Sequence, residues 1–176
     1  MSLPLKPALP RSLALLALGS LALAACSTTA PTDTGGASSG APLPTAGYDW
    51  HLNHDGAEAS LSYGMAETDD VPLDLSCVQG SRSLTLLLNT RKGAPHRIAL
   101  ESGGETETYR ATAEPAPLGE GLDLTAQATT SDPVFIRFKQ TGWLAVNTGE
   151  VRRALVANED SKPQISQFFE ICDPAS

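Results

Sequence analysis

Residues 57–65 read Ala-Glu-Ala-Ser-Leu-Ser-Tyr-Gly-Met, and this run holds the clearest structural signal in the chain. Larger or apolar side chains occupy every second position from Ala57 to Met65, and small or polar residues lie between them. A period of two is typical of a β-strand with one buried face. Related alternation occurs in residues 73–77, 84–88, 98–100, 122–124 and 134–138.

Gly, Pro, Asn and Asp separate these runs, as they do in antiparallel sheets. We therefore predict a mainly β fold, an antiparallel β-sandwich or small barrel of roughly 8–10 short strands. Residues 53–56 and residues 140–142 are predicted hairpin turns. In the second turn, Gly142 would supply a positive φ between a strand at 134–138 and the strand that contains Leu144.

The last apolar run changes period and predicts a short C-terminal helix. Ser161 followed by Gln164 fits a capping box, and Pro163 is tolerated in a first helical turn. The apolar stripe of this helix is expected to pack on the sheet. The stripe consists of Ile165, Phe168, Phe169 and Cys172.

The N-terminal segment has the features of an export signal. Lys6 and Arg11 precede an apolar run at 13–23, which is shorter than the roughly 20 residues of a membrane-spanning helix. The sequence Leu23-Ala24-Ala25-Cys26 resembles the lipobox of bacterial lipoproteins. The resemblance implies that residues 1–25 are a signal peptide and that Cys26 becomes the lipidated first residue, with membrane attachment through its palmitate and diacylglycerol chains. The alternative is an ordinary secretory signal followed by a chance cysteine.

Residues 26–46 contain the lipidated Cys26 and a Ser-, Thr-, Gly-, Ala- and Pro-rich stretch, which we interpret as a disordered tether. Residues 47–176 are then expected to form a single globular β domain. Ser27 stands where an Asp would retain some lipoproteins at the inner membrane. We therefore expect a lipid-anchored protein of the cell envelope, on the outer membrane and facing the periplasm.

The charge of the mature chain limits its partners. The whole chain has 12 Lys and Arg against 20 Asp and Glu, and removing Lys6 and Arg11 leaves 10 against 20, a net charge of −10. Nucleic acids select basic surfaces, so a nucleic-acid partner is not expected. The charge favours a basic envelope or extracellular protein as partner, and simple solubility is the alternative explanation.

Two cysteines remain once Cys26 is acylated. Cys77 and Cys172 form an even pair in an oxidising compartment, which predicts a disulfide between the sheet and the C-terminal helix. A metal pair or two free thiols are the alternatives, although neither cysteine has other ligands nearby in the sequence.

Candidate catalytic and metal-binding residues are scattered. His51 and His54 form an H-x-x-H pair, but a strand would point them to opposite faces. Acidic residues cluster at 69–74 and 101–107 without a calcium-loop spacing. Ser102 lies six residues after His96, and no nucleophile motif surrounds it. We therefore expect neither an enzyme nor a bound metal or cofactor.

Two family resemblances involve the cysteines. The order of Cys77, a Ser-Gly loop ending in Tyr and Cys172 resembles the membrane-bound lysozyme inhibitors, small β-barrel lipoproteins whose loop enters the lysozyme cleft. This resemblance implies a binding loop formed by Ser102, Gly103, Gly104 and Tyr109. Residues 77–80 and 169–172 also resemble a periplasmic family associated with type VI secretion. The inhibitor family's later Trp-Lys-Gly element is absent here.

Taken with the charge, these observations favour a non-enzymatic binding or interaction module of the envelope with an unidentified ligand. A lysozyme-inhibitor-like protein is the first alternative, and a periplasmic hydrolase the second. A structural role beside other envelope components would also fit.

Overall fold

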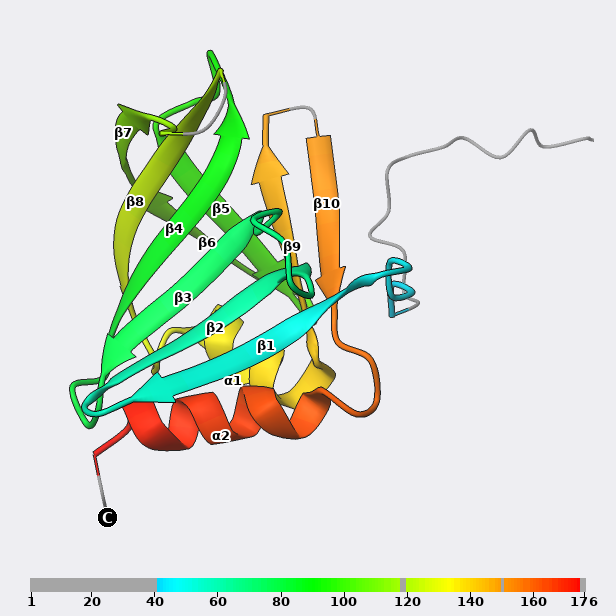
Figure 1. Cartoon of the computed structure of the whole chain (residues 1–176), viewed down its shortest axis with the longest axis vertical. Helices are drawn as coiled ribbons and strands as arrows, with labels where there is room; N and C mark the ends of the chain where they lie inside the picture. The colour runs from blue at the N-terminus through cyan, green and yellow to red at the C-terminus, as the bar shows by residue number, and fades with distance from the viewer. Residues whose placement is uncertain (1–40, 118–119, 150, 175–176) are drawn as a thin grey trace, which may run out of the picture. The chain divides into compact units, whose positions relative to one another are not determined.

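The structure is a computed structural model that describes residues 41–117, 120–149 and 151–174 (Figure 1). Cys26, the signal segment and most of the predicted tether lie outside these residues. The described part is mainly β, as predicted, with ten strands and two helices. The elements are β1 (Tyr48–Asp55), β2 (Glu58–Met65), β3 (Leu73–Val78), β4 (Ser83–Arg91), β5 (Arg97–Ser102), β6 (Glu105–Arg110), β7 (Thr112–Pro115), β8 (Gly121–Thr129), α1 (Pro133–Thr141), β9 (Trp143–Thr148), β10 (Val151–Val156) and α2 (Lys162–Cys172).

Two antiparallel sheets enclose one main core. The first has the strand order β1-β2-β3-β4-β8-β7, and the second has the order β10-β9-β5-β6. Buried leucines of both sheets, such as Leu75 and Leu144, belong to the same apolar cluster. Of the two predicted architectures, the two-sheet arrangement is therefore observed, and the described strands do not close into one barrel.

The alternation recognised in the sequence sets the register of the first sheet. Leu61 pairs with Leu75, and Leu75 pairs with Leu86, so three inward side chains lie in one row across β2, β3 and β4. All three are fully buried. A slip of one residue would turn this row toward solvent, which is why the apolar pattern specifies the pairing.

The first predicted hairpin is confirmed, with its turn slightly later than expected. Asp55 pairs with Glu58, which leaves a two-residue turn of Gly56 and Ala57 between β1 and β2. Gly56 has a φ of +58°, a conformation that glycine adopts without a steric cost. Along β1, Trp50 is buried and His51 is exposed, as the period predicts.

The predicted strand at 134–138 is wrong, because this segment is helix α1. The three residues that α1 buries are Val134, Phe135 and Phe138, whereas Ile136 is 42% exposed. Pro133 stands in the first turn, and Gly142 ends the helix with a φ of +73°. A proline at the start and a glycine at the end favour a helix. These end signals, with the helical spacing of the buried residues, outweigh the three-residue alternation. The predicted hairpin turn at 140–142 is therefore a helix end.

Helix α2 is confirmed and buries the predicted stripe, but the predicted capping box is not formed. The hydroxyl of Ser161 donates a hydrogen bond to the carboxylate of Asp49 on β1. The side chain of Gln164 accepts a hydrogen bond from the backbone N–H of Leu52, with 2.9 Å between Oε1 and N. Both side chains therefore join α2 to β1, and this tertiary contact replaces the local cap.

The two helices lie at the same end of the sheets in Figure 1. Helix α1 contacts β5 and β6, and α2 contacts β1 and β2. Aromatic rings fill the space between them: Phe138 lies 6.1 Å from Phe169 and 4.8 Å from Trp50, measured between ring centroids. Within the described ranges, neither helix has the length and apolar character needed to cross a bilayer.

Candidate functional site

The structure buries the first residue of the predicted binding loop. Ser102 ends β5 and has no solvent exposure. Its hydroxyl donates to the carbonyl oxygen of Trp143 at 2.8 Å and lies 2.9 Å from the hydroxyl oxygen of Thr141. His96, six residues earlier in the sequence, is exposed and lies just before the start of β5. Ser102 therefore joins the end of α1 to the second sheet.

The remaining loop residues are held by α1 and by the segment before it. Gly103 and Gly104 form the β5–β6 turn with φ values of +53° and +92°. Arg137 of α1 donates to the carbonyl oxygen of Gly103, with 3.2 Å between Nη2 and O. The Tyr109 hydroxyl donates to Asp132 at 2.9 Å, and burial together with this carboxylate raises the pKa of Tyr109. The predicted binding loop is thus a short turn tethered to α1, and its binding role stays a prediction.

Among the described residues, no three His, Cys, Asp or Glu side chains come together in a way that could hold a metal ion. His51 and His54 lie three residues apart on β1, where successive side chains point to opposite faces.

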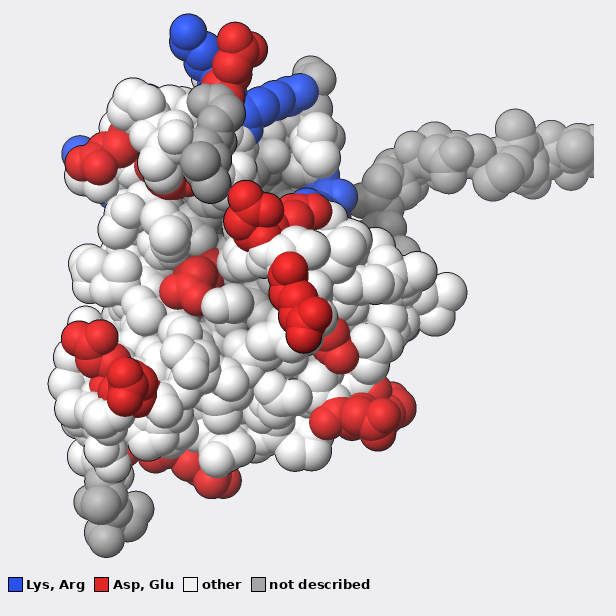
Figure 2. All heavy atoms as spheres, in the orientation of Figure 1, with Lys and Arg blue, Asp and Glu red and all other residues white. Residues whose placement is uncertain are grey.

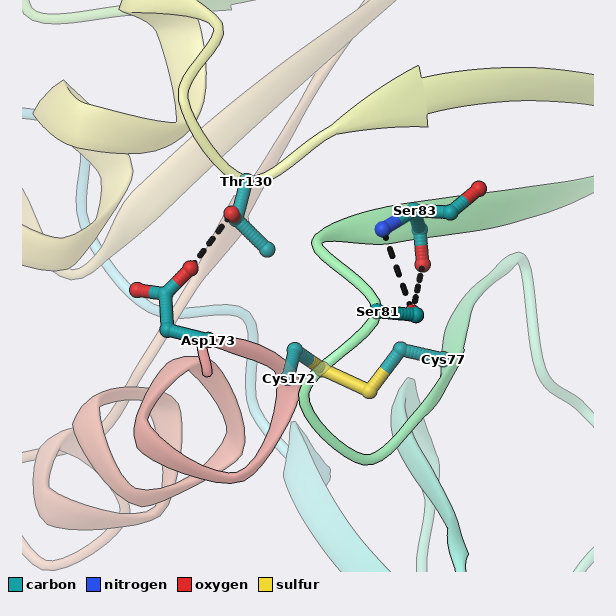
Figure 3. The surroundings of a disulfide bond; sticks show 6 residues. All are labelled: Cys77, Ser81, Ser83, Thr130, Cys172 and Asp173. Atoms are coloured by element: carbon teal, nitrogen blue, oxygen red, sulfur yellow. Dashed lines mark hydrogen bonds between the residues drawn. A yellow bond between two sulfur atoms is a disulfide. The ribbon is translucent and has the colours of Figure 1, made fainter. Parts of the chain in front are cut away.

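Cys77 and Cys172 form the predicted disulfide, with 5.8 Å between their Cα atoms (Figure 3). The bond joins the end of β3 to the end of α2. Backbone contacts reinforce the same junction: Gly80 donates to the carbonyl oxygen of Ile171 at 2.9 Å, and Arg82 donates to that of Cys172 at 3.0 Å. The metal-pair and free-thiol alternatives for the two cysteines do not apply to this structure.

A groove of about 460 Å³ is a candidate site in the described part of the chain. It forms where β4 extends beyond β3. Leu73, the first residue of β3, pairs with Leu88, whereas β4 continues to Arg91. The backbone of Asn89 instead donates to the carbonyl oxygen of Pro72 at 3.0 Å, which holds the β2–β3 loop beside the opening. The residues that line the groove are Asp69, Asp70, Val71, Pro72, Asp74, Leu87, Asn89, Ala116, Pro117, Asp123 and Arg153.

The groove carries four carboxylates. Figure 2 shows several separate groups of Asp and Glu side chains spread over one face of the molecule. Asp70 accepts a hydrogen bond from the hydroxyl of Tyr48. Asp123 accepts one from the side-chain amide of Asn89 at 3.0 Å, and Asp74 accepts one from the hydroxyl of Ser62. These three partners are neutral, so they bring no positive charge into the groove, and each carboxylate has further acceptor sites.

One cation, Arg153 of β10, lines the same groove. Its guanidinium lies over the ring of Tyr48, 5.0 Å from the centroid. No carboxylate oxygen of the described residues lies within 4.0 Å of it. The neighbouring Arg152 differs, because it makes two contacts of 3.0 Å with Glu101 on the outer face of the second sheet.

Only some of the residues that line this groove can be recognised from the sequence. Asp69, Asp70 and Asp74 are visible as an acidic cluster, but Asp123 and Arg153 reach the groove from β8 and β10. They reach the groove because β8 pairs with β4, which is not next to it in the sequence, and because the two sheets pack together. No local pattern in the sequence reports either feature.

Asp74 and Asp49 differ in the effect of folding on their ionisation. Burial raises the pKa of Asp74 above its ordinary value of 3.8, against the lowering effect of its hydrogen bond from Ser62. Partial burial acts in the same direction on Asp49, but hydrogen bonds from Ser161, Asn158 and the backbone outweigh it and lower the pKa of Asp49. Folding therefore disfavours the ionised form of Asp74 and favours that of Asp49.

Asp74→Asn is expected to raise the free energy of unfolding at pH 7 by up to about 1 kcal/mol, because the amide avoids desolvating a charge. The pKa of Asp74 is higher in the folded than in the unfolded protein, so the ionised side chain destabilises the fold. This destabilisation is fully present above the folded pKa and disappears as the pH falls below the unfolded value near 3.8. Urea unfolding of both proteins at pH 7 and pH 3 measures the difference. A destabilised variant at pH 7 would contradict this account.

Asp49→Asn is the matched control, and it should change the free energy of unfolding in the opposite direction. The folded pKa of Asp49 is lowered, so its stabilisation is present above the unfolded value near 3.8 and is lost as the pH falls through the folded pKa. The variant should therefore be less stable than the parent at pH 7 by up to about 1 kcal/mol, since it weakens charge-assisted hydrogen bonds at a carboxylate that solvent partly screens.

The chain matches no protein-family model, no curated protein and no solved structure.

Proposed function

We propose that this protein is a non-enzymatic, lipid-anchored binding module of the bacterial cell envelope whose partner is a basic protein. The observation that carries the binding part is the groove with its four aspartates, Asp69, Asp70, Asp74 and Asp123. Carboxylates with free acceptor positions suit Lys and Arg side chains, which are donors only. The net charge of the mature chain would also speed the encounter with a basic surface.

The proposed lipid anchor and the proposed cellular location are both inferred from the lipobox resemblance at residues 23–26. Attachment to the outer membrane, facing the periplasm, is the location that we infer. The described chain approaches the domain at Tyr48, whose hydroxyl binds Asp70 in the groove. A tether at this point would join the domain beside its proposed binding surface.

We favour the groove over the loop at 102–109 as the contact surface. Ser102 is buried, and Arg137 and Asp132 already hold Gly103 and Tyr109. An inhibitor-like loop that enters another protein's cleft would need its polar side chains to be available. A partner bound at the groove would meet carboxylates whose present partners are neutral.

The test uses residues 26–176 with Cys26→Ser, immobilised and exposed to envelope extract at low and high salt. We expect the parent to retain basic proteins at low salt, and Asp69→Asn with Asp74→Asn to lower their retention at least fivefold. High salt should release them, because exposed charge contacts are screened. Mass spectrometry of the eluates measures retention.

Glu58→Gln with Glu170→Gln is the control, because it removes the same charge at exposed positions of β2 and α2, outside the groove. If this control lowers retention as much as the groove variant, overall charge rather than the groove explains binding. If the parent retains no basic protein at low salt, the proposed function fails.

A further inference from the structure

The position of Arg153 points to an anionic group on the partner. A guanidinium near several carboxylates usually forms a bidentate ion pair, as Arg152 does with Glu101. Arg153 is instead held over the ring of Tyr48, at 5.0 Å. Arg153 is exposed, and no oxygen of the described residues accepts a hydrogen bond from it, so its N–H groups remain available.

The two signs of charge come from different sheets. Arg153 belongs to β10 of the four-stranded sheet, whereas Asp74 and Asp123 belong to β3 and β8 of the six-stranded sheet. Asp69 and Asp70 come from the loop before β3. The positive charge of the groove therefore comes from one sheet, and its negative charges come from the other sheet and from the loop that leads into it.

Apolar side chains lie among these charges. Leu87 is 40% exposed in the groove, and Val71, Pro72 and Ala116 also line it. Such a lining suits the methylene stem of a long cationic side chain, which packs on apolar surface while its charged end stays polar. The volume of about 460 Å³ lies within the usual range of small-ligand sites.

We propose that the groove binds a lysine or arginine residue that carries a free carboxylate, namely the C-terminal basic residue of a peptide or protein. Arg153 would hold the carboxylate, the aspartates would hold the side-chain cation, and Leu87 would contact the methylene stem. This inference rests on the proposed function and adds the chemical class of the group that the basic partner presents.

Three matched probes test it by NMR titration of residues 26–176 with Cys26→Ser. Nα-acetyl-lysine has both charges, Nα-acetyl-lysinamide has only the cation, and N-acetyl-norleucine has only the carboxylate. We expect Nα-acetyl-lysine to bind with a millimolar Kd and each other probe to bind at least about tenfold more weakly, since each lacks one charge-assisted contact.

Arg153→Gln should reduce the affinity for Nα-acetyl-lysine about tenfold and leave that for Nα-acetyl-lysinamide unchanged. Arg152→Gln removes the same charge from a residue outside the groove and should alter neither affinity. Thermal unfolding of each variant checks that the domain is still folded, so that a loss of binding can be assigned to Arg153.

Equal binding of Nα-acetyl-lysine and its amide would overturn the role of Arg153. Absence of binding by all three probes would overturn the whole inference. In both cases, retention of basic proteins that depends on the groove aspartates would leave the proposed function standing. If that retention also fails, the function itself is refuted.

Discussion

Replacing both Cys77 and Cys172 with alanine is expected to lower the free energy of unfolding by about 2–5 kcal/mol. The disulfide closes a segment with a sequence separation of 95 residues, so its loss gives the unfolded chain considerable conformational freedom. Alanine is the suitable replacement because Cys77 and Cys172 are 7% and 0% exposed, and a buried serine hydroxyl would add a separate cost. Urea unfolding of the non-reduced parent and the variant measures the change.

The same variant should loosen one end of α2 more than the rest of the domain. Without the bond, the end of α2 is held by two backbone contacts with the β3–β4 turn and by the hydrogen bond from Thr130 to Asp173 (Figure 3). Hydrogen exchange should therefore increase first in residues 165–174. Thr130→Val is the control, because it removes only the side-chain contact and should cost about 1 kcal/mol. A double-alanine variant within 0.5 kcal/mol of the parent would show that the disulfide contributes little.

Cys26→Ser is expected to abolish lipid labelling completely and to release the protein from the membrane fraction. The proposed diacylglycerol is attached through the thiol, so a hydroxyl at this position leaves no acceptor. Several acyl chains give stable anchoring, and the loss should therefore be seen as a transfer of nearly all the protein to the soluble fraction. Metabolic labelling with an alkyne palmitate in a bacterial host, followed by fractionation, measures both effects.

The double alanine variant at Cys77 and Cys172 serves as the labelling control. It removes two of the three cysteines of the chain and should keep full labelling, since only Cys26 lies in the lipobox-like sequence. Labelling that survives Cys26→Ser would refute the proposed anchor. The binding proposal for the groove would then need a different account of how the domain stays in the envelope.

Structural features with local causes leave a pattern in the sequence, and features with long-range causes do not. The strands with long alternation, such as residues 57–65, were predicted correctly because burial of one sheet face imposes a period of two on the sequence. The segment 134–138 was predicted wrongly, because three alternating apolar residues also fit a helix when Phe135 joins Val134 and Phe138 on the buried side. Pro133 and Gly142 were the local signals that could have corrected it.

The predicted capping box at Ser161 and Gln164 is not formed, for a different reason. Ser161 and Gln164 have the right spacing for a local cap, but Asp49 and the free backbone edge of β1 lie beside them in the folded chain. A side chain binds the partner that the tertiary structure brings closest, and sequence spacing cannot report that competition.

The order of the residues was sufficient for the β class, the C-terminal helix and the Cys77–Cys172 pair, because periodicity and a small number of cysteines restrict these features locally. The groove required the folded chain. Asp74, Asp123 and Arg153 lie on β3, β8 and β10, and they meet because β4 pairs with β8 and because the two sheets pack together. Long-range pairing depends on the complementary surfaces of whole sheets, so no short stretch of sequence contains the information that places an arginine among four aspartates.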